Sequence, residues 1–500
     1  MIDSRTPVLV GVGQVSERLD SPGYQARSPV GLAADAARAA LEDAGVPASA
    51  VDTVAGVPQF EISLPWATPL LGCSDNFPRS VAVRLGATPR RAVLEVGGGQ
   101  APQHLVNEFA ATIAAGDAEV VLLFGSEAIS TIAALAGTPS PPDFSESPGG
   151  SLEARGHGLD GIVSMHHVAH GLSDTPSQYA LIENARRARL KMSREDYARA
   201  IGELFSPFTA VAAANPHAAA PVFRDSVSLV TPTAANRPIA DPYTRYVVAR
   251  EKVNQGAAVL LMSTGAARRL GVPESNWVFL AGHADLRERN LLDRADYGTS
   301  PAAVRAARHA LEVAGISSDS LAVLDLYSCY AAPVFIVAEA LGIATDDPRG
   351  LTVTGGLPFF GGPGNNYSMH AIVSVVERVR SAPGSYGFVG ANGGIMSKHS
   401  TGVYTTIPYA FQPSHSERIQ AELDAAPAPA EAVNADGPAV IETYTVKHPP
   451  EGIVLGRLES DGRRFVARAD AILDLLTEGE PIGERVTVRS TADGNAIVPG

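Results

Sequence analysis

One seven-residue segment occurs twice in this chain, about 270 residues apart. Ala40–Val46 (ALEDAGV) recurs as Ala310–Ile316 (ALEVAGI), and the upstream pairs Ser28-Pro29 and Ser300-Pro301 lie at nearly the same offset. In each copy a serine is placed to cap a helix, proline takes its first position, and glycine ends it. Solenoid repeats have periods of roughly 20–50 residues. The longer spacing therefore predicts two similar halves related by a pseudo-twofold axis.

Short apolar runs alternate with amphipathic stretches in both halves. The predicted strands are 8–12, 51–54, 92–96 and 118–124 in the first half, and 277–281, 321–326 and 386–389 in the second. The predicted helices are 28–45, 101–115, 301–314, 331–341 and 367–379. Such alternation favours a mostly parallel sheet covered by helices on both faces, with right-handed crossovers.

The pattern changes at points that suggest domain boundaries. Residues 1–275 form the first half and include a looser excursion over 130–238, and residues 276–413 form the second half. Alanine–proline alternation within 414–436 is typical of a linker. Short alternating segments over 437–500 predict a small antiparallel β-barrel domain.

Composition excludes several classes of protein. The formal net charge of the 500 residues is −14, and the basic residues form no cluster of the kind that nucleic-acid binding needs. The N-terminus lacks a signal-peptide pattern, and no apolar run approaches the ~20 residues of a membrane span. Two cysteines are too few for a disulfide framework. We therefore expect a cytoplasmic protein.

Several segments resemble the thiolase superfamily. Ile113–Glu127 is similar to that family's helix, strand and Gly-x-Glu turn, and Asn215–Ala218 to its Asn-Pro-x-Ala element. Asn254–Leu260 resembles the strand that closes the first half. The resemblance is strongest to the sterol-carrier-type thiolases and, among them, to thiolase-like proteins of type 1, which carry an added C-terminal β domain. It implies a duplicated, five-layered α/β fold with a loop excursion.

The catalytic motifs of the family are altered at most positions. Its nucleophilic cysteine would fall at Gly99, or at Gly98 if the turn is shorter, and its catalytic histidine at Gly362. Its second catalytic element becomes Tyr327–Tyr330, and its last, a glycine-rich loop expected at Gly390–Gly394, lacks the cysteine found in many members. The resemblance therefore implies an acetyl-CoA-acetyltransferase-like chain without thiolysis, because glycine cannot supply a thiolate.

The glycine-rich segments still suggest a ligand site. We expect Gly98, Gly99, Gly361, Gly362, Asn365 and Gly393 to approach the ligand, and Tyr327, Cys329 and His399 to be the candidate catalytic side chains. The resemblance implies a coenzyme A thioester as the ligand. We expect no tightly bound cofactor and no metal.

Several other residues have a structural interpretation that is favoured over a functional one. His104 is interpreted as a histidine on a helix face, Cys73 as an unreactive thiol, and the cluster His166, His167 and His170 as a surface group. Asn365-Asn366 is interpreted as capping the helix that follows.

Three functions remain open at this point. The chain could act on an acyl-CoA without acyl transfer to cysteine, by retro-aldol cleavage or decarboxylation. It could bind acyl-CoA without catalysis, or act as a scaffold whose C-terminal β domain holds a protein partner. It could also be an acyltransferase with a nucleophile that the motifs do not reveal.

Overall fold

Two sheets and three sets of helices form the main body of the protein. The structure, a computed structural model, describes residues 2–159 and 164–498. The first sheet has the order β1 (Pro7–Ser16), β8 (Asn254–Ser263), β4 (Val120–Ala128), β2 (Thr53–Val57), β3 (Arg91–Leu94) and β5 (Glu153–Ala154). Strands β2 to β5 are parallel to one another, and β8 is antiparallel to both β1 and β4.

The second sheet is smaller and mixed. Its order is β10 (Leu321–Asp325), β11 (Tyr386–Gly393), β12 (Lys398–Thr405) and β9 (Phe279–Arg287). Strands β10 and β11 are parallel, whereas β12 is antiparallel to both of its neighbours. The sequence did not predict β12.

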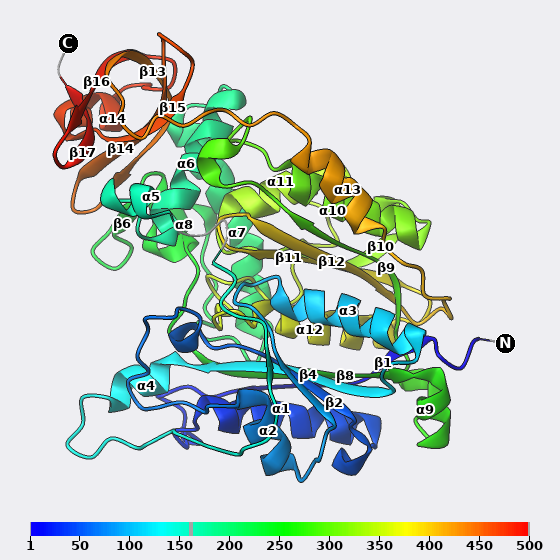
Figure 1. The fold of residues 1–500 in the computed structure, drawn as a ribbon. Coiled ribbons are helices and arrows are strands. Elements are labelled where there is room, and N and C mark those ends of the chain that lie inside the picture. Colours follow the sequence, from blue (N-terminus) through cyan, green and yellow to red (C-terminus); the bar gives the residue numbers. More distant parts are fainter. Residues whose placement is uncertain (1, 160–163, 499–500) are drawn as a thin grey trace.

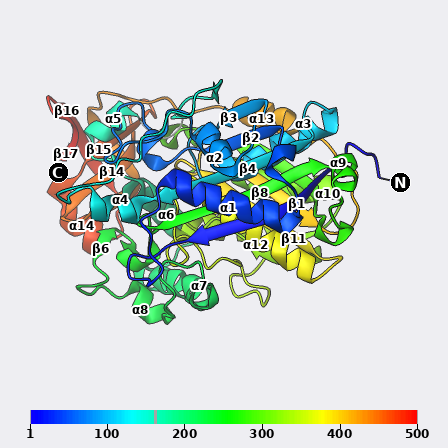
Figure 2. The ribbon, with the colours of Figure 1, turned by 90° about the horizontal axis from the view of Figure 1, so that it is seen from below.

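Helices separate and cover the two sheets (Figures 1 and 2). Helices α3 (Ala101–Ala115) and α12 (Tyr367–Ser381) lie between the sheets and contact both. Helices α1 (Pro29–Ala44) and α2 (Phe77–Leu85) cover the outer face of the first sheet, and α10 (Pro301–Ala314) and α11 (Ala331–Leu341) that of the second. The layers therefore run helix, sheet, helix, sheet, helix, which confirms the predicted fold class.

The repeated segment marks equivalent helices. A Cβ atom on Gly11 of β1 would clash with the carbonyl of Ala40 and lie 3.0 Å from the Ala44 side chain. One on Gly282 of β9 would meet Ala310 and Ala314 in the same way, again 3.0 Å from the Cβ of Ala314. Both helices end at a left-handed glycine with nearly the same φ, 66° and 65°. The two halves thus pack helix on strand through matching residues.

One continuous apolar core joins the two sheets through the central helices. It includes Leu123 of β4, Phe109 of α3, Val375 of α12 and Val403 of β12, all at 0% exposure. A separate cluster fills the space between the first sheet and α1. This packing fixes α3, and with it the turn that precedes α3, relative to both halves.

The excursion after β4 is mainly helical. It contains α4 (Ile129–Leu135), α5 (Met165–Ala169), α6 (Thr175–Arg189), α7 (Arg194–Ala214) and α8 (Ser226–Val230). The short strands β6 (Pro238–Ala240) and β7 (Tyr243–Thr244) follow, and α9 (Thr264–Arg269) lies after β8.

The C-terminal domain is a closed five-stranded β-barrel. Strands β13 (Gly437–Lys447), β14 (Glu451–Leu458), β15 (Arg464–Arg468), β17 (Gly494–Val498) and β16 (Arg485–Thr491) pair in this order, and β16 returns to β13. The short helix α14 (Leu473–Glu478) lies between β15 and β16. All pairs are antiparallel except β15 with β17. The barrel prediction is confirmed.

The barrel is attached firmly to the excursion. Arg187 of α6, whose side chain is 2% exposed, forms an ion pair of 2.7 Å with Glu480. Arg464 of β15 donates to the main-chain oxygens of Leu292 and Ala295 at 3.1 Å. These buried guanidinium groups link the barrel to both halves of the chain.

The segment predicted as a linker contains a helix. Helix α13 (Ser416–Asp424) lies along the open edge of β9. Ser416 Oγ accepts from the Asp285 N–H at 3.0 Å. The Gln420 amide accepts from the Arg287 N–H at 2.7 Å and donates to its carbonyl at 3.1 Å. This segment therefore satisfies a strand edge that would otherwise be exposed.

Among the described residues, no helix combines the length and the apolar character needed to cross a membrane.

Candidate functional site

The turn Gly97–Gly99 links β3 to α3. Gly98 has a φ of 143°, which favours glycine. The Gly98 N–H donates to Asn365 Oδ1 at 2.8 Å, and Ser368 Oγ donates to the Gly99 carbonyl at 2.6 Å. The beginning of α12 thus holds the turn in place.

The hydroxyl of Tyr327 fills the space beside Gly99. A Cβ atom on residue 99 would lie 2.5 Å from both Tyr327 Cζ and the Asn392 carbonyl oxygen, and closer still to Tyr327 Oη. Real Cβ atoms essentially never show contacts below 3.0 Å. No side chain therefore fits at residue 99 while Tyr327 keeps this position.

The buried carboxyl group of Asp325 positions Tyr367, whose ring packs against Tyr327. Tyr327 follows β10, and its ring meets that of Tyr367 edge-on, with centroids 5.5 Å apart. Tyr367 donates to Asp325 Oδ1 at 2.9 Å, and Thr352 donates to Asp325 Oδ2 at 2.9 Å. Burial raises the pKa of Tyr327 well above its ordinary value, so the phenol is neutral at pH 7. Its hydroxyl has no hydrogen-bond partner among the described residues.

The segment Gly390–Gly394 was predicted to be a loop, and this prediction is wrong for its first four residues. They belong to β11, which pairs with β12 along its whole length. A Cβ on Gly393 would lie 3.1 Å from the Gly99 nitrogen. A strand, rather than a loop, therefore closes one side of the Gly97–Gly99 turn.

His399 lies in β12, directly opposite Asn392. It is buried, its Nε2 lies 3.1 Å from the Met396 carbonyl oxygen, and burial lowers its pKa to about 4. A cavity of about 20 Å³ is lined by Tyr327, Asn392, Met396 and His399, among others. This volume accommodates about one water molecule. Tyr327 and His399 both line this cavity, which is too small for a larger ligand.

Cys329 is 8% exposed, and burial raises the pKa of its thiol to about 12. Its Sγ lies 3.9 Å from Asn392 Nδ2. A thiol in this environment is protonated at pH 7 and unreactive. Cys73 lies in a loop and is half-buried, and burial also raises the pKa of its thiol, with smaller contributions from Glu61 and Asp75.

The turn Gly361–Gly364 faces a different part of the molecule. A Cβ on Gly361 would lie 2.8 Å from Gln255 and Val253, and one on Gly362 would lie 3.4 Å from Leu357. Gly361 and Gly362 therefore do not meet Gly99, in contrast to the prediction.

Asn365 and Asn366 were predicted to cap α12, but this prediction is wrong. Asn366 occupies the N-cap position without a side-chain hydrogen bond, and its amide atoms are buried without partners among the described residues. Asn365 instead connects the beginning of α12 to the loop before α2. It donates to the Pro58 carbonyl and to Ser63 Oγ, both at 2.8 Å.

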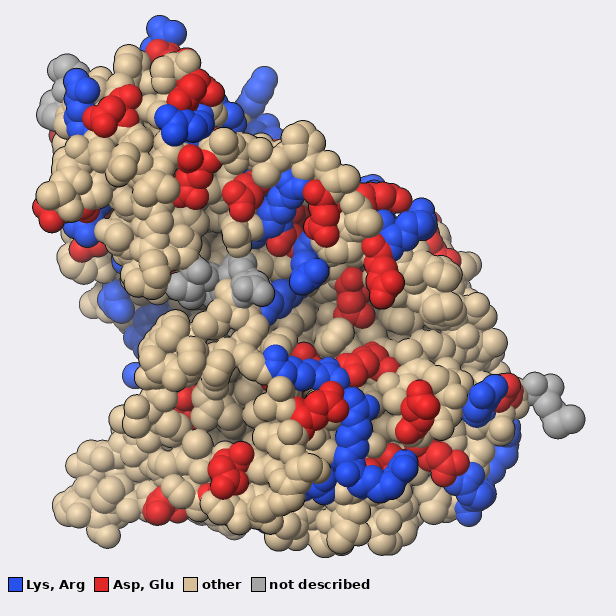
Figure 3. Space-filling model, viewed as in Figure 1, with Lys and Arg blue, Asp and Glu red and all other residues tan. Residues whose placement is uncertain are grey.

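A cleft of about 950 Å³ opens between α3, the ends of β9 and β12, and α13. Figure 3 views this side of the molecule, where basic and acidic side chains are interspersed. The lining includes six Asp or Glu and three Lys or Arg side chains: Glu95, Asp285, Glu288, Asp293, Glu417, Asp424, Arg287, Arg289 and Lys398. The cleft is therefore large but more acidic than basic.

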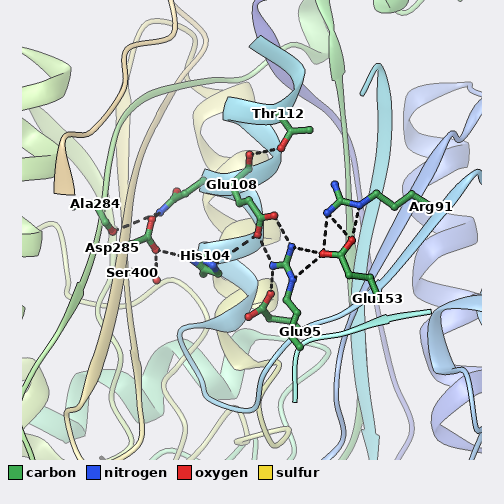
Figure 4. Close-up of polar contacts among 11 residues, drawn as sticks. Arg91, Glu95, His104, Glu108, Thr112, Glu153, Ala284, Asp285 and Ser400 are labelled. Atoms are coloured by element: carbon green, nitrogen blue, oxygen red, sulfur yellow. Dashed lines mark hydrogen bonds and ion pairs between the residues drawn. The ribbon is translucent and has the colours of Figure 1, made fainter. Parts of the chain in front are cut away.

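His104 and Asp285 form the central polar pair of the cleft (Figure 4). His104 Nδ1 lies 3.0 Å from Asp285 Oδ1, which also accepts from Ser400 Oγ at 2.6 Å. Burial alone would lower the pKa of His104, but Asp285, assisted by Glu95 and Glu108, raises it to about 9. His104 is thus a cation at pH 7, with its side chain 37% exposed.

The group of Glu95, His104 and Glu108 has possible metal-ligand atoms within 4.8 Å of one another. Arg155 forms ion pairs with both glutamates, at 2.5 Å to Glu108. Because Arg155 and the charged imidazole already balance these carboxylates, the donor set does not suit a metal ion.

Three arginines gather where the excursion returns to the core. The guanidinium group of Arg224 lies 3.9 Å from the centre of the Tyr246 ring. Burial, together with the charges of Arg245 and Arg224, lowers the pKa of Arg250. None of the three guanidinium groups has an ion-pair or hydrogen-bond partner within the described part of the chain. Sequence reasoning missed this cluster because its members are not contiguous.

The arginine cluster adjoins the Gly361–Gly364 turn. The Gly362 N–H donates to the Arg250 carbonyl at 2.8 Å, and the Arg250 N–H donates to the Leu357 carbonyl at 3.1 Å. The cluster is therefore held beside one of the predicted ligand-binding turns.

The histidines of the excursion contact the barrel. His170 Nε2 accepts from the Asn495 N–H at 2.8 Å, and His166 Nε2 lies 3.4 Å from Glu431. Burial lowers the pKa of His167 to about 4. His167 and His170 are buried rather than exposed, so the surface interpretation of this cluster is wrong.

Comparisons with known proteins agree with this architecture. The chain is 48% identical to a monomeric SCP2-thiolase-like protein type 1 from Mycobacterium smegmatis, with 100% of both chains covered and a TM-score of 0.87. The family model for the additional C-terminal domain of thiolase-like protein type 1 matches residues 418–494. No curated protein matches the chain.

More distant structures share the fold alone. The Ltp2–ChsH2(DUF35) aldolase is 19% identical, with a TM-score of 0.59 over 80% of this chain and 98% of that chain. Human mitochondrial 3-ketoacyl-CoA thiolase is 17% identical, with a TM-score of 0.57 over 81% of this chain and 100% of that chain.

Proposed function

The chain belongs to the SCP2-thiolase-like proteins of type 1, and we propose that it binds a coenzyme A thioester without carrying out thiolysis. The proposal that thiolysis does not occur rests on the Tyr327 hydroxyl, which fills the space beside Gly99. A nucleophile at residue 99 would need a side chain, and none fits there. A glycine in contact with a tyrosine hydroxyl can neither form an acyl-enzyme nor leave room for one.

The distribution of charged side chains indicates where the phosphate groups of the ligand would bind. The cleft beside His104 carries more carboxylates than cations, so polyphosphate would be repelled there. Arg224, Arg245 and Arg250 have no carboxylate partners among the described residues and supply local positive charge in a chain of net charge −14. Guanidinium groups suit phosphate because their N–H donors match its oxygens. We assign the phosphates of the ligand to this cluster.

Calorimetric titration with coenzyme A and acetyl-CoA tests the assignment. Arg245→Ala with Arg250→Ala should weaken binding by ~10-fold or more, since hydrogen bonds to charged groups contribute about 1.5–3 kcal/mol each. Raising the salt concentration should weaken coenzyme A binding to the unaltered protein. It should weaken binding to the variant by a smaller factor, because two of the charges are gone. Arg378→Ala, a surface change on α12, serves as the control. Absence of binding at millimolar ligand would reject the proposal and leave a scaffold function.

The free hydroxyl of Tyr327 favours a second candidate, retro-aldol cleavage of an acyl-CoA. A neutral phenol without a protein partner can donate to a carbonyl oxygen as negative charge develops there. The substrate would have to displace Asn392 or Met396, because the adjoining cavity is only about 20 Å³. Tyr327→Phe should lower such an activity by ~10²-fold while leaving coenzyme A affinity unchanged. An equal rate in the variant would exclude this role of the tyrosine.

A further inference from the structure

A second cavity, of about 510 Å³, lies at the end of the first sheet where β1 ends and β8 begins. Its walls come from residues 16–20, 217, 219–222 and 252–255, together with Ser130. Because β8 is antiparallel to both β1 and β4, the carboxyl ends of β1 and β4 share this side of the sheet. Ligands of open α/β sheets bind outside the carboxyl ends of their strands.

A serine and a histidine meet in this cavity. Ser16 Oγ, at the end of β1, lies 3.2 Å from His217 Nδ1. The main chain of His217 is held on both sides, since its N–H donates to Asn215 Oδ1 at 3.0 Å and its carbonyl accepts from Gln255 Nε2 at 2.9 Å. The two side chains therefore come from different parts of the fold and are positioned independently of each other.

His217 is suited to accept a proton. Burial lowers the pKa of its imidazole, so the ring is neutral at pH 7. When Nε2 carries the proton, Nδ1 accepts the Ser16 hydroxyl hydrogen. A neutral imidazole hydrogen-bonded to a serine is the arrangement that activates a hydroxyl nucleophile.

Gln255 lines the same cavity and holds the main chain of His217. Its side chain is buried at 1% exposure, and its Nε2 donates to the carbonyls of His217 and Phe360, both at 2.9 Å. These two donations fix the amide orientation, and Oε1 is buried without a partner among the described residues. The Gln255 amide therefore positions His217 and is not itself open to a ligand.

The lining of the cavity carries charges of both signs. Lys252 is exposed and has no carboxylate partner in the described residues, and Arg18 lies 3.7 Å from the exposed Asp20. Glu17 also lines the cavity and forms an ion pair with Arg27. The charged side chains of the lining therefore do not select an anionic acyl donor over a neutral one.

We propose that this cavity is a second reactive site, in which Ser16 accepts an acyl group from an activated ester or thioester with His217 as general base. In the step, Ser16 Oγ forms a bond to the acyl carbon while its proton passes to His217 Nδ1. The bond from the acyl carbon to the leaving oxygen or sulfur breaks, and the leaving group departs with the bonding electron pair. Water then hydrolyses the serine ester, or an acceptor hydroxyl or amine takes the acyl group. The proposal does not depend on the site at Gly99.

The full-length protein treated with p-nitrophenyl acetate tests this inference. We expect release of p-nitrophenolate and acetylation of the peptide that contains Ser16, detected by mass spectrometry. Ser16→Ala should abolish labelling of that peptide. His217→Asn keeps an acceptor near Ser16 but removes the base, so labelling should slow by ~10²-fold. Ser275→Ala, which changes an exposed serine remote in sequence, is the matched control and should react as the unaltered protein does.

Two results would overturn the proposal. One is acetylation of Ser16 no faster than that of the exposed Ser275 in the unaltered protein. The other is an equal rate of labelling after His217→Asn, which would show that the imidazole does not act as a base. Thermal unfolding midpoints of all variants establish that a loss of labelling is not a loss of folding.

Discussion

Replacing Gly99 by alanine is expected to destabilise the protein by about 2 kcal/mol, within the roughly 1–3 kcal/mol that overpacking of a filled interior costs. The new Cβ would lie 2.5 Å from Tyr327 Cζ and from the Asn392 carbonyl oxygen. The main chain at Gly99 is outside the left-handed region, unlike Gly98 at 143°. Steric overlap rather than backbone strain therefore produces the cost.

A double-mutant cycle isolates the contribution of Tyr327. Tyr327→Ala removes both the Cζ and Oη contacts and leaves the contact with the Asn392 carbonyl in place. Gly99→Ala should then cost about 1 kcal/mol less than in the unaltered protein, which is within the range of couplings between residues in contact. Thermal midpoints measure the cycle, because about 2 kcal/mol corresponds to a fall of roughly 4–8 °C in a unit of 150–250 residues.

Gly137→Ala provides the control, since a Cβ there meets nothing within 4 Å. This change should alter the midpoint very little. If Gly99→Ala were tolerated as well as Gly137→Ala, or if its cost were the same with and without Tyr327, the conclusion that Tyr327 closes this position would be refuted.

The remaining predictions concern packing and ionisation. Gly282→Ala should destabilise the second half by roughly 1–3 kcal/mol, as Gly11→Ala should destabilise the first, because both glycines meet the repeated helix in the same way; equal midpoints with and without the changes would contradict this. Burial lowers the pKa of His167 from 6.5 to about 4, so the unfolded chain binds more protons between these values. The unfolding free energy should therefore be highest above pH 6.5 and fall by up to roughly 3 kcal/mol as the pH drops to about 4; urea midpoints should show less of this fall in His167→Gln. Asp285→Asn should lower the pKa of His104 from about 9, measured by NMR titration, and an unchanged value would show that Asp285 is not its main partner.

The duplicated fold was predictable because its signals are local. Serine, proline and glycine mark both ends of α1 and α10, and each signal acts within a few residues of the helix. The close approach of Gly11 and Gly282 to these helices was not predicted, since no local pattern around a glycine in a strand reveals which helix packs against it. The repeat therefore predicted which helices are equivalent but not how each contacts its strand.

The formation of β12, and of the part of β11 that closes one side of the Gly97–Gly99 turn, depends on contacts with residues far away in the sequence. The segment 398–405 lacks an apolar alternation, because its polar side chains are buried and find partners on β9 and α10. Ser400 bonds Asp285, and Thr401 Oγ1 donates to the Ala306 carbonyl at 3.0 Å. No pattern within the segment indicates such partners. The prediction of a glycine-rich loop at Gly390–Gly394 failed for the same reason.

Because Tyr327 occupies the space beside Gly99, acyl transfer would have to take place elsewhere in the molecule. If a side chain were simply missing there, a cavity would remain, and empty volume in a packed interior costs about 24 cal/mol for each Å³. Here Tyr327 and the Asn392 carbonyl fill that space, so the closed turn contributes to packing as an ordinary part of the core. A reactive group then has to lie where space and a neutral base occur together. Ser16 and His217 satisfy both conditions, in a cavity of about 510 Å³ whose Gln255 side chain also contacts the Gly361 turn. Selective labelling of Ser16 would place any acyl transfer at the end of β1 instead of at the beginning of α3.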